Sequence, residues 1–484
     1  MSLNVKNELA LPRSTPEAQG LPSSAIVAFL GAVETHNLEL HSFMLLRNGF
    51  VVTEGWWNPY VAELPHLLFS LSKSFTSTAI GLAVSEGILS LDDQVISFFP
   101  DETPDEVLPN LSAMQIRHLL MMGTGHAQDT LGSLRKNENG NWAEAFLQQP
   151  VEHAPGTNFV YNSGATYMLS AILHKVTGQS LMDYLQPRLL DPLGIYHATW
   201  ETCPRGIHAG GWGLSLTTES IAKFGQLYLQ QGIWNGDRII PEAWVAEATS
   251  KQISNGDGGE SDWAQGYGYQ FWSCRHDAYR GDGAFGQFCI VMPQQNAVIA
   301  ITAGLNNMQA VLDAIWTHLL PAMVPTPLPY LEESAIELAE RLQQLCLQPP
   351  QLGVSSPQET AFAGQYQLEE NSLRWDTFTI RFDEGEASIQ LRDQIGDHHF
   401  RCGRGAWIEQ KSSLNQGLEQ QVAVSFTWRD PDTLELTVRY LETPFCHTVV
   451  CRSEGTQLTF EIILNVSFGP QETLLMRGER LLEQ

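Results

Sequence analysis

A serine and a lysine stand three residues apart in the segment LFSLSKSFTSTAIGLAVSEG, at Ser70 and Lys73. Lys73 is the only charged residue in the 19 positions from Leu67 to Ser85. This composition predicts a helix that is buried on every side, with Ser70 one turn before Lys73 on the same face. Because burial favours the uncharged lysine, Lys73 would act as a base toward the Ser70 hydroxyl. A structural role, in which Lys73 only pairs with a distant carboxylate, stays open.

Two further pairs have the same spacing, Ser133 with Lys136 and Ser220 with Lys223. The first lies in the polar string GSLRKNENGN, which is typical of a surface loop. The second follows LTTE, a capping string at the start of an amphipathic helix, so we expect Lys223 to point to water. The spacing alone is therefore weak evidence, and only Ser70 adds a setting that would perturb the lysine.

A second group of polar residues follows a Pro-Gly turn and precedes a predicted helix: Tyr161, Asn162 and Ser163. Among the 12 tyrosines, Tyr161 alone has a serine or asparagine two positions later. A tyrosine oxygen near an ammonium group can share its proton, and a hydroxyl two residues on can pass that proton to a leaving group. The alternative is an ordinary half-buried tyrosine whose hydroxyl is satisfied.

With both groups present, the segment from about residue 12 to 322 resembles the serine β-lactamase and penicillin-binding-protein superfamily, in particular esterases and peptidases related to class C β-lactamases. The strings EGILSLDDQVISFFP, MQIRHLLMMGTGH and GGWGLSLTTESIAKFGQLYLQ support the resemblance. It implies that Ser70 is the acylated nucleophile and that Lys73 and Tyr161 take and return its proton as a pair. Ser163 and Asn162 are then expected to relay the proton or bind substrate.

The third element of that family is a Lys-Thr-Gly or His-Thr-Gly triplet, and the best local match is Gly281-Asp282-Gly283, without the basic residue. In relatives this triplet lines the pocket, so Asp282 and Gly283 are candidate substrate-binding residues. By position, the backbone N–H of Ala284 would complete an oxyanion hole with that of Ser70.

The missing basic residue argues against a β-lactamase or a carboxypeptidase that must bind an anionic C-terminus, although Arg280 would be able to compensate. Ester hydrolysis, or cleavage of an amide beside a neutral or positively charged group, is favoured instead. A D-amino acid peptidase with the same catalytic residues and a non-catalytic binding protein on the same fold remain alternatives. The aromatic residues ahead of the triplet and near residue 56 would line an apolar pocket or belong to the core: Trp56, Trp57, Tyr267, Tyr269 and Trp272.

These residues need a scaffold, and the strings around them predict an α/β fold with an antiparallel sheet flanked by a helical cluster. FMLLRNGFVVTEGWW reads as a hairpin turned at Asn48-Gly49. A second predicted hairpin turns at 293–296, so strands from both ends of the domain would share one sheet. We expect the hydrolase domain at 1–325, a helix and linker at 326–359, and a separate domain at 360–484.

The C-terminal domain shows period-two alternation typical of antiparallel strands. Leu434, Leu436, Val438 and Tyr440 alternate with polar residues, and 458–464 repeats the pattern. We predict an all-β domain built as a small barrel, and some relatives carry a lipocalin-like barrel in this place. No catalytic motif lies there, so a capping role or homo-oligomer formation is expected.

Composition limits the partners. The 484 residues carry a net charge of −27, which disfavours nucleic acid and anionic membranes and favours cationic substrates, or reflects solubility alone. The N-terminus lacks a secretory pattern, which predicts a cytoplasmic protein. The seven cysteines and 14 histidines show no metal-type spacing, so we expect no metal or cofactor and a small ester, amide or short peptide as substrate.

Overall fold

The computed structural model describes residues 10–351, 359–414, 419–469 and 473–481. The chain forms two compact units, each assembled from separate stretches. The first comprises Met1–Gly55, Pro65–Thr302 and Asn307–Gln343, and the second comprises Trp56–Leu64, Ala303–Asn306 and Gln344–Gln484. This division places the helix of the expected linker, α14 (Glu332–Gln343), in the first unit. It assigns two short stretches of the expected hydrolase domain, Trp56–Leu64 and Ala303–Asn306, to the second.

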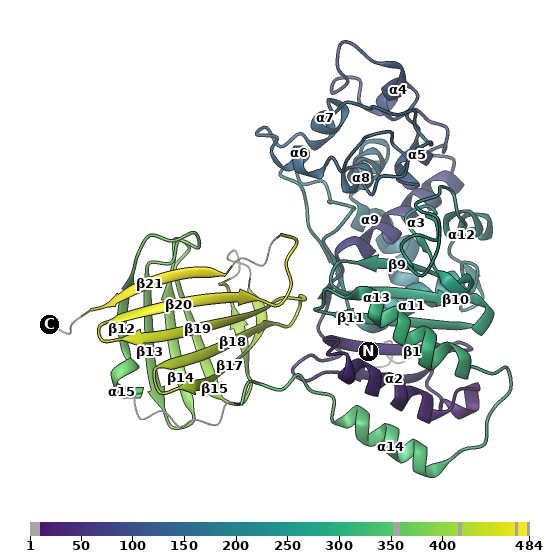
Figure 1. Ribbon diagram of the computed structural model, residues 1–484. Helices are drawn as coiled ribbons and strands as arrows, with labels where there is room; N and C mark the ends of the chain where they lie inside the picture. The colour runs from purple at the N-terminus through teal and green to yellow at the C-terminus, as the bar shows by residue number, and fades with distance from the viewer. Residues whose placement is uncertain (1–9, 352–358, 415–418, 470–472, 482–484) are drawn as a thin grey trace, which may run out of the picture. The chain divides into compact units, whose positions relative to one another are not determined.

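The first unit contains an antiparallel six-stranded sheet in the order β2-β1-β11-β10-β9-β8 (Figure 1). Both predicted hairpins are confirmed, and the N-terminal strand β1 lies beside β11 from the end of the unit. Every residue of β1, β10 and β11 is buried, as expected for strands covered on both faces. The strand bounds are β1 Leu40–Arg47, β2 Phe50–Trp56, β8 Trp272–Ser273, β9 Tyr279–Gly283, β10 Gln287–Met292 and β11 Ala297–Ala303.

Helices cover both faces of this sheet. Phe43 of β1 packs on Phe29 of α2, whereas its neighbour Ser42 accepts a hydrogen bond from Thr218 of α11. Because successive strand residues point to opposite faces, α2 and α11 lie on opposite sides of the sheet. Phe224 of α11 stacks on Phe75 of α3, with the ring centroids 3.9 Å apart. Helix α3 therefore lies on the same side of the sheet as α11.

The helices of the first unit are mostly short. Those from α4 to α8 gather at the end of this unit away from α2 (Figure 1). Their bounds are α2 Ser23–Thr35, α3 Ser72–Ser85, α4 Pro109–Ser112, α5 Ile116–Leu120, α6 Leu131–Arg135, α7 Trp142–Leu147, α8 Ser163–Thr177, α9 Leu181–Leu185, α10 Asp191–Leu193, α11 Thr218–Leu229, α12 Glu242–Thr249 and α13 Met308–Ala314.

Helix α3 is buried on all sides, as its composition predicts, but it begins later than the apolar stretch does. A short 3-10 turn, η2 (Phe69–Leu71), precedes it and carries Ser70. Phe69 has a φ of 46°, a left-handed conformation that is uncommon outside glycine. The predicted nucleophile therefore stands on a sharp turn at the N-terminal end of α3 rather than within a regular helix.

The second unit contains a closed nine-stranded barrel, which confirms the predicted β domain. The strands run antiparallel around the ring, and a short parallel pairing of β15 with β17 closes it. The predicted alternation places Leu434, Leu436 and Tyr440 in the barrel core. Strand and helix bounds are α15 Glu359–Phe362, β12 Gly364–Leu368, β13 Thr377–Asp383, β14 Glu386–Arg392, β15 Asp397–Arg404, β16 Ile408–Ser412, β17 Gln420–Asp430, β18 Thr433–Tyr440, β19 Cys446–Glu454, β20 Gln457–Leu464 and β21 Leu474–Arg480.

An early stretch of the chain belongs to this barrel unit. Tyr60 is buried in a small cluster with Ala423 and Leu441. The backbone of Asn58 also exchanges hydrogen bonds with the segment that leads into the barrel, at 3.1 Å to Leu345 and 2.8 Å from Leu347. The stretch Trp56–Leu64, which starts at the last residue of β2, is therefore held by residues about 290 to 380 positions later in the sequence.

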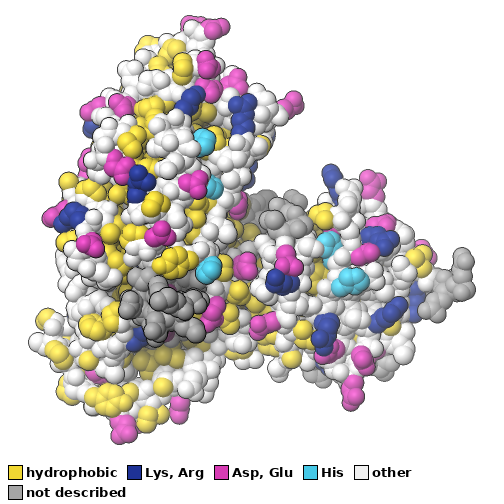
Figure 2. All heavy atoms as spheres, turned by 180° about the vertical axis from the view of Figure 1, so that it is seen from behind, with side chains coloured by type: hydrophobic (Ala, Val, Ile, Leu, Met, Phe, Trp, Pro, Cys, Tyr) yellow, Lys and Arg dark blue, Asp and Glu magenta, His cyan; other side chains and the backbone are white. Residues whose placement is uncertain are grey.

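The acidic side chains form no single patch on the face that Figure 2 shows; they are scattered among Lys, Arg and hydrophobic side chains. Such mixing is typical of a surface on which charge serves solubility. Within the described ranges, no helix combines the length and the apolar character that a membrane span requires.

A matched pair of helical glycines tests how tightly α3 is packed. A Cβ at Gly81 of α3 would lie 2.3 Å from the indole of Trp244 on α12, whereas a Cβ at Gly31 of α2 would meet nothing within 4 Å. We expect Gly81→Ala to lower the free energy of unfolding by about 1–3 kcal/mol through overpacking. Gly31→Ala should raise it by about 0.5–1 kcal/mol. Calorimetric melting of both variants measures these changes in stability. Equal changes in the two variants would contradict the close packing of α3 on α12.

Candidate active site

The structure brings Ser70, Lys73 and Ser163 into hydrogen-bonding distance. Lys73 Nζ lies 3.0 Å from Ser70 Oγ and 3.2 Å from Ser163 Oγ, and it donates to the Gly211 carbonyl oxygen at 2.8 Å. Lys73 is 1% exposed. Ser70 is half-buried, so its hydroxyl keeps access to a reactant. This arrangement fits a hydroxyl nucleophile beside a base.

Burial is the main influence on the charge of Lys73. Desolvation lowers the pKa of the Lys73 amino group to about 7, although the negative charges of Asp129 and Asp282 act in the opposite direction. A substantial fraction of the amine is then neutral near pH 7, and its lone pair can accept a proton from Ser70. A structural ion pair is a poor account of this lysine, because its hydrogen-bond partners are two hydroxyls and a carbonyl.

The ring of Tyr161 lies against the same lysine. Lys73 Nζ lies 4.8 Å from the centroid of its ring, and a hydrogen bond links its hydroxyl to Ser70. Burial raises the pKa of Tyr161 well above its ordinary value, and the nearby Asp282 raises it further. The phenol therefore stays protonated in this arrangement. Trp272 stacks on the ring at 5.3 Å and fixes its orientation.

Asn162 and Ser163 open helix α8, and their placements differ. Ser163 Oγ faces Lys73, as a proton relay requires. Asn162 is fully buried, and its Oδ1 accepts hydrogen bonds from Thr130 and from the backbone N–H groups of Gly164 and Ala165. Asn162 is thus the N-cap of α8 and ties the 124–131 loop to it, which suits a positioning role.

Asp129 is a site residue that the sequence reasoning missed. Its Oδ1 accepts a hydrogen bond of 2.9 Å from the backbone N–H of Ser163, and its charge raises the pKa of Lys73. The residue is exposed. It lies in a Gly/His/Gln loop without a recognisable pattern, so nothing in the chain singled it out. An exposed carboxylate at the start of α8 adds negative charge at the edge of the site.

Strand β9 lies directly against the Ser70 turn. A Cβ on Gly283 would come within 1.9 Å of the Leu68 carbonyl oxygen, and a Cβ on Gly281 would come within 2.6 Å of Ser74 Oγ. Both glycines are needed because the strand and the turn approach so closely. Ala284 follows at the start of the hairpin to β10 and is half-buried. Its N–H as an oxyanion donor stays a prediction.

Arg280 does not present a free charge to the site. It is fully buried, and its Nε donates to Asp282 Oδ2 at 2.8 Å. Its Nη1 donates to the Asp262 carbonyl oxygen and to Cys274 Sγ, and its guanidinium lies 4.3 Å from the Trp263 ring centroid. The cation that sequence reasoning offered as a compensation is therefore used within the protein.

The lysines of the two other Ser-Xaa-Xaa-Lys pairs differ in their exposure. Lys136 is exposed, as expected, but Ser133 lies in helix α6 rather than in a loop, and the expectation that Lys223 points to water is wrong. Lys223 is 6% exposed, and its Nζ lies 3.9 Å from Glu219, which also binds Arg13 and the Leu11 backbone. The N-terminal segment covers this face of α11, and a helix-local pattern cannot reveal such a distant partner.

Among the aromatic candidates, Tyr267 and Trp272 surround Tyr161, with ring centroids 6.2 and 5.3 Å away. Tyr269 instead packs on Trp244 and donates a hydrogen bond to Glu247. Trp56 and Trp57 fall in the stretch that belongs to the barrel unit. Two of the five candidates are thus close to the reacting groups.

Two known proteins of similar sequence carry the names of hydrolases, and both have modest identity to this chain. The 6-aminohexanoate-dimer hydrolase of Paenarthrobacter ureafaciens is 24% identical over 278 residues, which cover 53% of this chain and 71% of that protein. The lovastatin esterase of Penicillium rubens is 29% identical over 150 residues, which cover 26% of this chain and 37% of that protein. The second match spans little more than a third of its relative.

Solved structures extend the likeness to the whole fold. The octameric penicillin-binding protein homologue from Pyrococcus abyssi aligns with a TM-score of 0.50 and 16% identity, covering 94% of this chain and 99% of that one. The model of the Beta-lactamase family matches residues 29–320, which is more than half of the chain and includes every candidate site residue. The chain therefore belongs to the Beta-lactamase family.

Proposed function

We propose that this protein is a serine hydrolase that cleaves an ester or amide bond through an acyl-enzyme on Ser70. The observation that carries the proposal is the Lys73 amino group, buried and 3.0 Å from Ser70 Oγ, with its pKa lowered to about 7. A lysine that is neutral near physiological pH and aimed at a half-exposed serine hydroxyl has the chemistry of a general base.

The reaction divides into two steps. Ser70 Oγ attacks the carbonyl carbon while its proton moves to Lys73 Nζ, and the carbonyl oxygen takes the negative charge under the N–H groups of Ser70 and Ala284. Ser163 Oγ, 3.2 Å from Lys73 Nζ, relays the proton to the departing alcohol or amine. A water molecule then attacks the acyl carbon and gives a proton to Lys73 Nζ. Lys73 passes this proton to Ser70 Oγ as the bond between Ser70 and the acyl group breaks and the carboxylic acid leaves.

Of the pair that sequence reasoning left unassigned, the charges favour Lys73 as the base. Burial lowers the pKa of Lys73 but raises that of Tyr161, so the proton leaves the lysine first. Tyr161 then serves as a hydrogen-bond partner that orients Ser70 and supports the relay. Replacing its hydroxyl should slow the reaction without removing the base.

Ester hydrolysis is the favoured reaction, and amide cleavage in a D-amino acid peptide is the alternative. The site offers no free basic group for a substrate carboxylate, since Arg280 is buried against Asp282. The charge of Asp129 instead favours a substrate with a cationic or neutral group near the scissile bond, whereas the charge of Asp282 is paired with that of Arg280. The names of the relatives, a hydrolase of an aminohexanoate dimer and an esterase, are compatible with both reactions.

Labelling with a fluorophosphonate tests the nucleophile. We expect one adduct on the Ser70 peptide, none on Ser70→Ala, and labelling of Tyr161→Phe slowed by about a hundredfold. Mass spectrometry of the intact protein and its peptides gives the site. Ser220→Ala is the matched control, because Ser220 has the same Ser-Xaa-Xaa-Lys spacing and a buried lysine. No adduct on folded protein would favour a non-catalytic binding protein.

The pH dependence of labelling tests Lys73 as the base. The neutral amine is the reactive form, so the rate should rise up to tenfold per pH unit below about pH 7 and level off above it. Asp129→Asn removes a negative charge that raises the pKa of Lys73, and this rising limb should move to lower pH. Asp105→Asn, in an exposed loop, should leave the limb in place. If Asp129→Asn left the rising limb of the pH profile in place, an electrostatic effect of Asp129 on the pKa of Lys73 would be excluded.

Substrate charge can be tested with two esters of one shape. Butyrylcholine and 3,3-dimethylbutyl butyrate differ in a quaternary nitrogen that replaces a carbon. We expect kcat/KM to be about five- to fiftyfold higher for the cationic ester at low salt, with the preference falling as salt increases. Asp129→Asn, assayed at pH 8.5 where Lys73 is mostly neutral in both proteins, should reduce the preference. Equal rates for both esters would refute the role given to the Asp129 carboxylate.

A further inference from the structure

The barrel interior is closed at one end by aromatic side chains. Phe362 of α15 packs on Trp428 at 5.2 Å and on Phe382 at 6.4 Å, near the turns that follow β13 and β17. The Tyr366 hydroxyl donates to the Phe362 carbonyl oxygen and fixes α15 in place. These side chains are buried or nearly so, and they fill this end of the barrel in the way that side chains fill small barrels.

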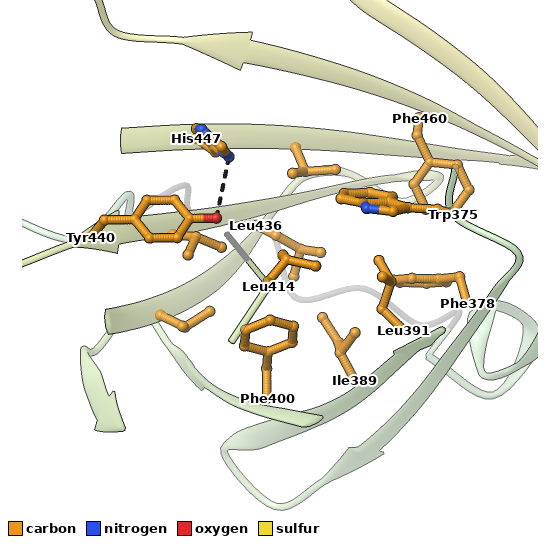
Figure 3. A pocket seen from close by; sticks show the side chains of 13 residues that line it. Trp375, Phe378, Ile389, Leu391, Phe400, Leu414, Leu436, Tyr440, His447 and Phe460 are labelled. Carbon is orange, nitrogen blue, oxygen red and sulfur yellow. Dashed lines mark hydrogen bonds between the residues drawn. The ribbon is translucent and has the colours of Figure 1, made fainter. Parts of the chain in front are cut away.

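The opposite end of the same barrel contains a cavity (Figure 3). Its cavity volume is about 40 Å³. Most of its 13 lining residues are aliphatic or aromatic, including Trp375, Phe378 and Phe460. This volume is far smaller than that of a site for a drug-sized ligand, so the cavity admits only a small, slender occupant such as an unbranched chain.

One polar pair faces this apolar space. The Tyr440 hydroxyl at the end of β18 and His447 Nδ1 at the start of β19 are 3.5 Å apart (Figure 3). This separation is long for a hydrogen bond between a hydroxyl and an imidazole, so neither group is fully satisfied by the other. An oxygen atom placed beside both would shorten two contacts and satisfy each group.

Both groups are uncharged. Burial lowers the pKa of His447 to about 4, and burial raises the pKa of Tyr440 above its ordinary value. The neutral imidazole offers one acceptor nitrogen, and the phenol offers a donor. The described residues that line the cavity include no Lys, Arg, Asp or Glu. A carboxylate brought into this space would lose its hydration without meeting a positive charge.

We propose that the barrel cavity is a binding site for a small, slender, uncharged molecule with a hydroxyl at one end, such as a medium-chain primary alcohol. Its hydroxyl accepts a hydrogen bond from Tyr440 and donates one to His447, while its chain lies among Trp375, Phe378 and Phe460. A hydroxyl can do both at once, whereas a ketone or an ester only accepts. The site lies wholly within the barrel unit and needs none of the chemistry proposed for Ser70.

Isothermal titration calorimetry of the full chain with 1-octanol and with octanoate tests the site. We expect 1-octanol to bind one-to-one with a negative heat-capacity change, and octanoate to bind at least tenfold more weakly at pH 8. Absence of saturable 1-octanol binding would overturn the proposal and make the cavity a packing feature. Equal or tighter octanoate binding would overturn the assignment to an uncharged ligand.

Two variants locate the binding within the barrel. Val438→Phe fills the cavity and should abolish 1-octanol binding, whereas Thr379→Phe adds the same ring on β13 at a position that alternates with the buried Phe378 and Ile380 and should leave it unchanged. Tyr440→Phe removes one hydrogen bond and should weaken 1-octanol about three- to tenfold with little effect on octanoate. Circular dichroism checks that each variant is folded. If Val438→Phe does not fold, the affinity of Tyr440→Phe for 1-octanol alone tests the location of the site. Undiminished binding in a folded Val438→Phe would place the ligand elsewhere and refute the proposal.

Discussion

The burial of one amino group organises the first unit. An ammonium group taken out of water and surrounded by helices costs several kcal/mol unless it is neutralised or well paired. Both effects contribute here. Three oxygen atoms accept hydrogen bonds from Lys73, and the negative charges of two carboxylates act on it from a greater distance. The balance leaves the group near the midpoint of its titration, where it can take a proton and also give it back.

Keeping that balance requires the surrounding backbone to come very close. A Cβ on Gly164 would lie 2.0 Å from Thr130 Oγ1, and a Cβ on Gly283 would lie 1.9 Å from the Leu68 carbonyl oxygen. Helix α8 and strand β9 therefore reach the lysine from two sides only because glycine stands at the points of contact. The conformational freedom that these glycines lose on folding is offset by a site that excludes most water around Lys73.

Much of this could be predicted from sequence, and the exceptions share a cause. Ser70, Lys73 and Tyr161 stand in short local patterns, and strand alternation at 433–440 predicts the β domain. The pairing of β15 with β17, the Asp129 carboxylate beside Ser163 and the burial of Lys223 all depend on residues far away in the chain. Local periodicity shows which face of an element is apolar, but it does not show what covers that face.

Arg280 and Asp282 illustrate the same limit at the site itself. The sequence places an arginine and an aspartate two positions apart, which on a strand means the same face, but it does not say whether they bind substrate or each other. The fold decides, because Asp262 and Cys274 supply further acceptors for Arg280 and leave it fully buried. The aspartate that stands in the triplet is therefore paired with Arg280 on the same strand.

The stretch Trp56–Leu64 limits where the chain can be divided into its two units. It ends a few residues before Ser70, yet Tyr60 within it packs with Ala423 and Leu441 of the barrel unit. Removing everything after residue 350 would strip that tyrosine of its neighbours and leave an apolar side chain exposed. The barrel is thus no detachable appendage. A cut at residue 350 would separate Trp56–Leu64 from the unit in which it packs, so the two units are not independent linear segments of the chain.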